Sequence, residues 1–449
     1  MRAFLKYIRI GIAILGGALF SSNTSGGELS FPNVDLTPVG AEMAGNADGS
    51  IPRWIGGDDN RKEFGPKLIK EKPLFTINKT NIEDYRTQLP NGLSGLVDHY
   101  PTTMTIPVYK SYRPVYLYPW IYEAIEKNSK SAKLTDGGDS ITDTYSGIPF
   151  PLAKTGYEVL WNHILAYRGV SVDVGSSEVV VHENRRARVV KNRVKYAIEY
   201  YNKDRKKSGL DQMYAYYLSS VTYPPKLSGG GLLVHERVNP SRIPRQAWGY
   251  MAGQRRVIRI PSVDYDAPMP RSGGIRFADE IDIYNGSIDR YSWRLVGKKE
   301  LIVPYNNELL YDEIKKDDVL SDKLYQQYHP DPQYLRYEKH RVWVVEGTLK
   351  EGASHPYKKR VLYMDEDTWL VVVAENYNKK NALWRVSASY VRLYHELPTA
   401  FKVVDVFHDL VEKSYFAQSI DPKREITTLS VMPAKQTFKP SALRRMGRR

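Results

Sequence analysis

The chain contains no cysteine among its 449 residues. This absence excludes thiol catalysis, disulfide bridges, Cys-ligated zinc, iron–sulfur clusters and a lipid-modified N-terminal cysteine. Beyond residue 20, no stretch approaches the roughly 18 continuous apolar residues that a membrane-spanning helix needs. We therefore expect a soluble mature protein.

Recognisable catalytic motifs are also missing. The sequence has no HExxH, no GxSxG, no phosphate-binding glycine loop and no dinucleotide-binding fingerprint. No group of residues combines a nucleophile with a base and an orienting partner. We therefore predict a protein that is not an enzyme and that uses no cofactor and no metal.

One acidic run, Asp365-Glu366-Asp367, allows two interpretations. Three neighbouring carboxylates could hold a hard cation. The run also lies between two strand-like stretches, where polar turn formers usually make a solvated hairpin turn. We expect the solvated turn.

The first segment has the order of a secretory signal. Arg2, Lys6 and Arg9 precede an apolar run over residues 10–20, which is too short to span a membrane, and small polar residues follow to Gly27. We expect residues 1–27 to be removed by a cut after Asn23 or shortly beyond it, with an uncleaved anchor as the alternative. Export without cysteine favours the bacterial periplasm and argues against a nucleic-acid partner.

The formal net charge of +14 is concentrated at the two ends. The first 27 residues carry three positive charges and the basic C-terminal tail, residues 432–449, carries six, which leaves +5 between them. We expect the tail to be a frayed terminus, with contact to anionic lipid as the alternative. A second basic run, from Arg185 to Lys195, alternates with valines and predicts a strand with a basic outer face. Its alternative role is to bind lipid phosphate or lipopolysaccharide.

Strand patterns dominate the chain. Aromatic residues alternate with small or polar ones at 248–252, 291–295 and 384–390. From Arg341 onward, the stretches 341–349, 359–365, 369–375 and 383–394 are separated by turn formers, which predicts an antiparallel meander.

Helices are fewer. Apolar residues at helical spacing predict helices near 120–125, over 157–165 with Gly169 ending the helix, and over 210–218. Residues 28–145 are predicted to wrap irregularly around a main unit over 146–431. A sheet with a few unevenly distributed helices indicates an α+β fold.

Five segments resemble one known family: LTPVGAEMAGNADGSIPRWIGG, GIPFPLAKTGYEVLWNHILAYRG, RRVIRIPSVDYD, HRVWVVEGTLKEGASHPYKKRVLYMDEDTW and YNKKNALWR. This is the exported bacterial family of domain of unknown function 1329, described as outer-membrane lipoprotein-sorting-like. The resemblance implies a LolA/LolB-like fold, in which a strongly curved antiparallel sheet forms a half-open barrel, closed by helices, around an apolar cavity. It also implies periplasmic residence and genes beside transporters of the resistance-nodulation-division type. It supplies no catalytic residues.

A wall rich in Tyr and Trp would be apolar and would still offer hydrogen bonds to a lipid headgroup. We predict that at least two of the strand rings and Trp161 border one pocket of roughly several hundred Å³. The alternative is that these rings fill a core and that the polar candidates pair with neighbouring turns. The cavity candidates are Trp161, Trp248, Tyr250, Trp293, Trp384 and Tyr390, and the headgroup candidates are His163 and Arg168.

The sequence therefore predicts a periplasmic carrier or accessory protein for a lipid or other hydrophobic small molecule. Its expected partner is a transporter of the resistance-nodulation-division type or an outer-membrane protein. A sensor or interaction module that binds a protein or lipopolysaccharide is the alternative. An enzyme acting on envelope lipid or polysaccharide is the third hypothesis.

Overall fold

The structure is a computed structural model that describes residues 35–57, 61–183, 187–203, 213–240, 242–260, 265–316, 323–394, 398–421, 427–429 and 432–446. The predicted signal segment, 1–27, lies outside these residues. Among the described helices, none is both long enough and apolar enough to cross a membrane.

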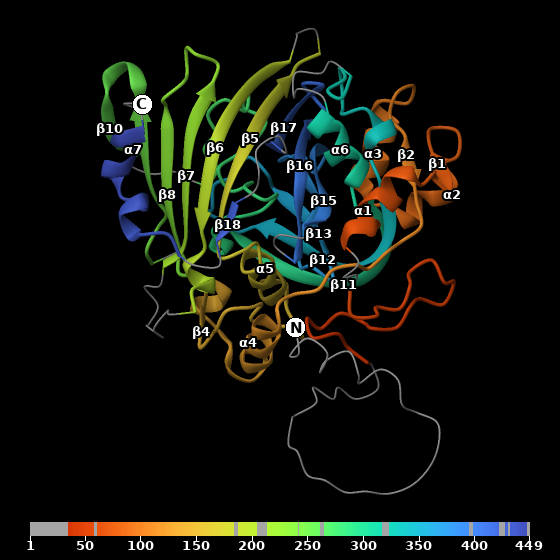
Figure 1. Ribbon diagram of the computed structural model, residues 1–449. Coiled ribbons are helices and arrows are strands. Elements are labelled where there is room, and N and C mark those ends of the chain that lie inside the picture. The colour runs from red at the N-terminus through yellow and green to blue at the C-terminus, as the bar shows by residue number, and fades with distance from the viewer. Residues whose placement is uncertain are drawn as a thin grey trace, which may run out of the picture.

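The described residues form one sixteen-stranded sheet, paired antiparallel except where β12 meets β2 (Figure 1). The strand order is β1-β2-β12-β13-β14-β15-β16-β17-β5-β6-β7-β8-β9-β10, with β11 also paired to β12 and β18 to β5. The strands are β1 (Phe75–Ile77), β2 (Ile106–Val108), β5 (Ser171–Val181), β6 (Arg188–Ala197), β7 (Met213–Tyr223), β8 (Gly231–Arg237), β9 (Gln246–Met251), β10 (Arg256–Ile260), β11 (Tyr291–Pro304), β12 (Tyr337–Leu349), β13 (Lys359–Asp365), β14 (Val371–Tyr377), β15 (Leu383–Tyr394), β16 (Thr399–Asp409), β17 (Ser414–Asp421) and β18 (Thr427–Leu429). A separate hairpin pairs β3 (Lys133–Thr135) with β4 (Ser140–Thr142).

The helices lie outside the strand meander in the sequence. They are α1 (Arg61–Lys70), α2 (Ile82–Tyr85), α3 (Asn91–His99), α4 (Pro119–Ser131), α5 (Gly156–Ile164), α6 (Glu308–Lys316) and α7 (Pro440–Met446). Helix α5 begins with a capping box, in which the Thr155 side chain accepts from the Glu158 backbone and the Glu158 carboxylate accepts from the Thr155 backbone. Helix α4 begins with proline at a position where helices tolerate it.

The sheet is strongly curved, and one pair of neighbouring residues shows how far it bends. The Ala278 carbonyl accepts a 3.0 Å hydrogen bond from Arg245, the residue just before β9, while Asp279 bonds Arg360 of β13. In a flat sheet, the nine strand spacings between β9 and β13 would separate them by about 43 Å. The two wings of the sheet therefore face each other across a concave interior.

Apolar cores lie on both faces of the sheet. The convex face packs on α3, α6 and the segment 75–108. The concave face packs on α4, α5 and residues 265–290, hereafter the interior segment. Residues 35–145 therefore do more than wrap the main unit, because they contribute β1 and β2 to the sheet and helices to both faces. The expected α+β fold with a strongly curved antiparallel sheet is confirmed, and the sheet does not close into a barrel.

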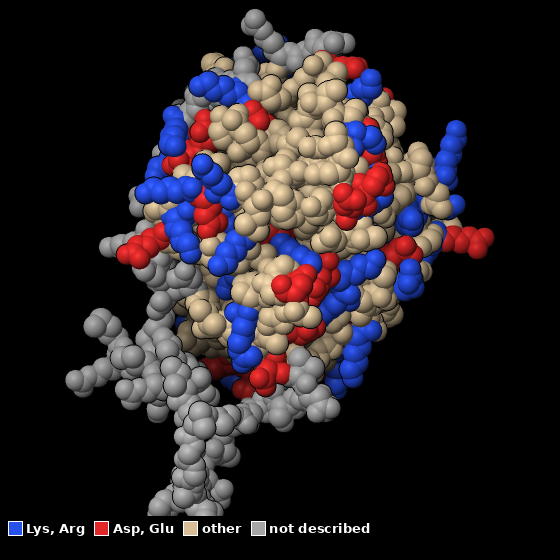
Figure 2. Space-filling model, turned by 90° about the vertical axis from the view of Figure 1, so that its right-hand side faces the viewer, with Lys and Arg blue, Asp and Glu red and all other residues tan. Residues whose placement is uncertain are grey.

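The surface carries mixed charge. Figure 2 shows the side of the molecule that includes α1, β1 and α3, where Lys and Arg side chains are interspersed with Asp and Glu around an uncharged area. On β6, Arg188 and Arg193 are exposed while Val190 and Val194 are buried, so the described part of this basic run forms the predicted strand. Arg193 pairs with Asp173 at 2.8 Å.

The helix predicted over 210–218 is wrong, because the described part of that stretch belongs to strand β7. Tyr216 packs on one side of β7 against Phe438, and Tyr217 packs on the other side against Tyr196. Because both faces of β7 meet other side chains, apolar residues do not alternate with polar ones, and the strand period is hidden in the sequence. The helices predicted near 120–125 and over 157–165 are present as α4 and α5.

The prediction of a frayed C-terminal tail is also wrong for the described residues 432–446. Phe438 and Leu443 are buried against Leu218, Leu233 and Tyr250 of the far wing of the sheet. The His235 ring contacts the Phe438 carbonyl oxygen at 2.8 Å. The basic side chains sit on a short apolar segment that covers β8–β10, where Figure 1 shows α7.

Candidate functional site

The concave interior, where a LolA-like fold is expected to have its cavity, is occupied by the interior segment. Its apolar side chains Ile275, Ile283, Tyr284 and Ile288 belong to the core of the concave face. Its polar side chains reach several strands. Arg271 pairs with Glu178 of β5 at 3.0 Å, Arg276 donates to Gln418 of β17 at 2.6 Å, and Asp282 pairs with Lys402 of β16 at 2.5 Å.

The centre of this contact is an ion pair between Arg360 and Asp279, whose closest atoms are 2.5 Å apart. Burial by itself would raise the pKa of Asp279, but the neighbouring Arg360 guanidinium holds that pKa below its ordinary value. The adjacent Glu280 accepts hydrogen bonds from Tyr357 and Asn376, both at 3.2 Å. Burial raises the pKa of Glu280 to about 7. The interior is therefore filled by protein with a charged centre.

Two small pockets lie where residues 35–57, hereafter the N-terminal segment, meet the start of α4 and the connection between β13 and β14. Each has a cavity volume of about 10 Å³, enough for about one water molecule. The pockets share Val39, Val115, Leu117 and Asp367, so they adjoin each other. The first is also lined by Ile121, Ile148, Tyr167, Tyr201, Thr368, Trp369 and Thr399.

The six predicted rings do not line either pocket. Trp161 and Trp293 are buried in the concave-face core, where their indole nitrogens donate to the carbonyls of Gly138 and Ile288. Tyr390 lies in the convex-face core, and Trp248 and Tyr250 belong to the cluster under α7. Trp384 is half-buried and donates to Asp409.

The prediction that these rings border one pocket is therefore wrong. Strand register sets which face each side chain takes, and a shift of one residue reverses it. Distance across the sheet also separates Trp248 on β9 from Trp293 on β11. Neither quantity can be read from the sequence alone.

The two headgroup candidates are used inside the protein. His163 is buried, with Nε2 3.0 Å from the Tyr284 carbonyl and Nδ1 accepting from the Val371 N–H at 3.1 Å. Burial lowers its pKa to about 3, so the ring is neutral. Arg168 donates to the Ala166 carbonyl at 3.0 Å and pairs with Asp282 at 3.3 Å. Both contacts match the alternative in which these residues hold neighbouring turns.

The acidic run is buried, although its composition predicted an exposed turn. Asp365, Glu366 and Asp367 are only 0%, 2% and 6% exposed, so the solvated turn is wrong. Arg113 forms a two-pronged contact with Asp367, at 2.8 and 2.7 Å, and Lys298 pairs with Glu366 at 2.9 Å. These cations lie far away in the sequence, which gives no sign that they cover this turn.

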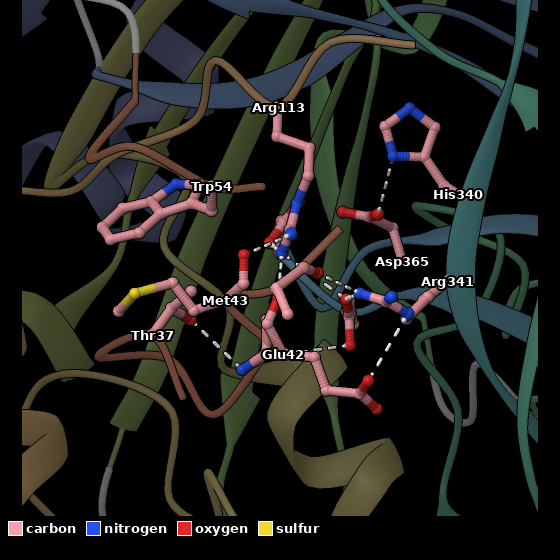
Figure 3. Close-up of polar contacts among 12 residues, drawn as sticks. Thr37, Glu42, Met43, Trp54, Arg113, His340, Arg341 and Asp365 are labelled. Carbon is pink, nitrogen blue, oxygen red and sulfur yellow. Dashed lines mark hydrogen bonds and ion pairs between the residues drawn. The ribbon is translucent and has the colours of Figure 1, made fainter. Parts of the chain in front are cut away.

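Figure 3 shows how the cluster is assembled. Arg113 points between the N-terminal segment and the acidic run, and it donates to the Glu42 carbonyl at 2.8 Å. Arg341 approaches from β12 and donates to the Ala44 carbonyl at 2.8 Å. The acidic run therefore fixes the N-terminal segment through shared arginines.

One part of this cluster has the composition of a metal site. His340, Asp365 and Asp367 are all buried, and each offers a ligand atom within 4.8 Å of the others. Imidazole nitrogen and carboxylate oxygen are ligands for divalent transition metals.

Comparison with known proteins gives relatives at two levels. The chain is 37% identical over 421 residues to an uncharacterized protein from Pseudomonas aeruginosa, which covers 92% of this chain and 91% of that protein. Among solved structures it is similar to a DUF1329 family protein from Desulfovibrio piger, with 16% identity, a TM-score of 0.45, and coverage of 64% of this chain and 97% of that one. A putative outer membrane lipoprotein-sorting protein domain from Vibrio parahaemolyticus gives 12% identity, a TM-score of 0.44 and coverage of 64% and 97%.

A sequence model of the expected family also matches the chain. The model described as "Protein of unknown function (DUF1329)" matches residues 76–444, which include every strand of the curved sheet except the first residue of β1. Together with the 37% identity to the Pseudomonas aeruginosa protein, this match extends over most of the chain. The chain belongs to the DUF1329 family.

Proposed function

We propose that this protein binds a lipid or other hydrophobic molecule in the bacterial envelope and acts as a carrier or accessory protein rather than an enzyme. The observation that supports this most is the pair of adjoining pockets beneath the N-terminal segment. Val39, Val115 and Leu117 give both pockets apolar walls, and Ile121 adds to the wall of the first. Tyr167 and Tyr201 add rings with a hydroxyl group to the first pocket. Such a wall suits a ligand with an apolar body and a polar end.

In this proposal the structure is the closed state. A cavity of about 10 Å³ is far smaller than the several hundred Å³ of an ordinary ligand site, so binding requires the N-terminal segment to move. Arg113 and Arg341 hold the middle of this segment, at Glu42 and Ala44. Among the described residues, two hydrogen bonds with residues outside the segment hold the part that lines the pockets, residues 37–39 and Trp54. Trp54 donates to the Val115 carbonyl at 3.1 Å and Trp369 donates to the Val39 carbonyl at 3.0 Å. Burying about 200 Å² of ligand surface would contribute about 5 kcal/mol, which is enough to offset the loss of such contacts.

The proposed setting is the periplasm, with the ligand passed to a membrane transporter or an outer-membrane protein. The export-type order of residues 1–27 supports this setting. The transporter partner rests on the family resemblance.

Titration of the purified protein with a pyrene-labelled fatty acid tests the proposal. We expect saturable binding, with a change in Trp emission. The partly buried Leu117 borders both pockets, so Leu117→Trp should fill them and weaken binding at least tenfold. Ile258→Trp adds the same ring at a residue that is 44% exposed on β10, and it should leave binding unchanged. Equal binding by both variants would show that the pockets are not the site.

The packed interior favours a second candidate, an envelope interaction module. All six predicted rings pack against protein, Trp384 through its ring contact with Tyr357. The interior segment packs on the concave face. The same titration separates the two candidates. An absence of saturable probe binding, together with a protein partner that co-purifies from envelope extracts, would support the interaction module.

A further inference from the structure

Four carboxylates are buried in and around the acidic run, and one of them has no cation among the described residues. Glu338 pairs with Arg336 at 2.5 Å, Glu366 with Lys298 at 2.9 Å and Asp367 with Arg113 at 2.7 Å. Asp365 is 0% exposed, and in the described part of the chain no Lys or Arg nitrogen lies within 4.0 Å of it. A buried carboxylate without a paired cation is costly.

The Asp365 carboxylate is held in one orientation. Its Oδ2 accepts hydrogen bonds from the Thr368 N–H at 2.9 Å, from the Thr368 hydroxyl at 2.7 Å and from the Tyr305 hydroxyl at 3.3 Å. Its Oδ1 has no hydrogen-bond partner among the described residues. That free oxygen lies 3.9 Å from Nδ1 of His340, beyond hydrogen-bond distance.

The His340 ring is oriented in the manner of a metal ligand. Its Nε2 lies 3.1 Å from Oε2 of Glu338, and its ring stacks on Tyr305 with 3.8 Å between centroids. Histidines that bind metals usually donate their other ring N–H to a carboxylate, which fixes the tautomer and ring position. Glu338 is itself fixed by Arg336 and by Asn306 at 3.0 Å. The remaining nitrogen, Nδ1, is directed toward Asp365 (Figure 3).

Asp367 completes the set, since its carboxylate lies within 4.8 Å of the other two ligand atoms. Among the described residues, Arg113 is the cation within 4.0 Å of Asp367, and no Lys or Arg nitrogen lies that close to Asp365. A divalent ion would supply the missing positive charge.

We propose that His340 Nδ1, Asp365 Oδ1 and a carboxylate oxygen of Asp367 bind a divalent transition-metal ion such as Zn²⁺. One imidazole and two carboxylates suit such an ion better than Mg²⁺ or Ca²⁺, which prefer oxygen ligands alone. The ion would connect β12 to the turn after β13. Because Asp367 also lines both pockets, this connection lies directly beneath the N-terminal segment.

The test uses the full chain, purified without a histidine tag, with its metal content measured by plasma mass spectrometry. After chelation and dialysis, calorimetric titration with Zn²⁺ should give about one ion per chain, with weaker binding of Mg²⁺ and Ca²⁺. At a free Zn²⁺ concentration 100-fold above Kd, the melting temperature should rise by about 3 °C.

The variants separate this site from adventitious surface binding. Asp365→Asn is nearly isosteric and removes the unpaired charge, so it should fold and lose Zn²⁺ affinity at least 100-fold. His340→Gln should do the same. Asp405→Asn is the control for a buried carboxylate outside the cluster, because Asp405 accepts from Ser389 at 2.7 Å and pairs with Lys402 at 2.8 Å. If the wild type does not bind Zn²⁺, or if Asp365→Asn binds it as tightly as the wild type does, the proposal is wrong. A proton or a water molecule would then balance the Asp365 carboxylate.

Discussion

Trp369 donates a 3.0 Å hydrogen bond from its indole nitrogen to the carbonyl oxygen of Val39, although the two residues are 330 positions apart. Both residues line the first pocket, so this bond connects the N-terminal segment to the turn between β13 and β14. Trp369 has a φ of 59°, which is unusual for a bulky residue, and its ring stacks on Trp343. Strained residues of this kind persist where the surrounding structure holds them.

Replacing this indole tests whether it holds the N-terminal segment in place. Trp369→Phe should leave the buried Val39 carbonyl without a donor and cost about 1–3 kcal/mol in the free energy of unfolding, measured in urea. Release of the segment should also speed the binding of the pyrene-labelled fatty acid. Trp54→Phe is the control, because Trp54 is only partly buried and water can replace its bond to Val115. Equal losses in the two variants would contradict this role.

The interior segment should depend on its central ion pair. Arg360→Met leaves Asp279 buried without its cation, and we expect a loss of roughly 3–5 kcal/mol in the free energy of unfolding. Amide hydrogen exchange over residues 275–285 should accelerate. Arg294→Met is the matched control, since Arg294 pairs with Glu346 at 3.0 Å but is largely exposed, so its loss should be below about 1 kcal/mol. If Arg360→Met loses no more free energy of unfolding than this control, the ion pair does not hold the interior segment.

The buried His163 predicts acid sensitivity. Its folded pKa of about 3 lies below the ordinary 6.5, so the unfolded chain takes up a proton that the folded chain refuses. Stability from this group is complete above pH 6.5 and falls by about 1.4 kcal/mol per unit as the pH drops toward 3. His163→Gln should be less stable at pH 8, yet its urea-unfolding free energy should decline less between pH 6.5 and 5. A parallel decline in both proteins would mean that His163 is not buried as a neutral ring.

The packing of the C-terminal segment can be measured directly. Leu443 is 1% exposed and packs on β8–β10. Leu443→Ala should therefore lower the free energy of unfolding by about 2–5 kcal/mol. Arg444→Ala alters an exposed neighbour and should change stability by less than about 0.5 kcal/mol. Thermal unfolding of the two variants, with circular dichroism as the probe, checks both values. If Leu443→Ala melts at the same temperature as the wild type, the C-terminal tail is frayed as the sequence predicted.

Features that depend on nearby residues could be predicted from the sequence. The apolar residues over 157–165 predicted α5, because their spacing of three and four residues acts within a few helical turns. The capping box at the start of α5 is also local. The meander from Arg341 followed from alternation and turn formers, which are also local. The family could be named from five segments because sequence blocks carry that information.

Features that depend on distant partners could not be predicted. The acidic run at 365–367 has the composition of an exposed turn, and it is buried because Arg113, 254 positions away, neutralises Asp367. The rings predicted to share a pocket were separated by strand register and by their places in the sheet, which no short window of sequence specifies.

The sequence by itself determined the class of fold, the strands of the meander and the family, because periodicity and turn chemistry act over short distances. Only the tertiary structure decided that the concave interior is filled, that the C-terminal segment is packed and that Asp365 is buried without a cation. The physical reason is that burial is a property of the whole assembly. A side chain loses its water only when elements from elsewhere in the chain, here residues 35–57, 265–290 and 432–446, are placed over it.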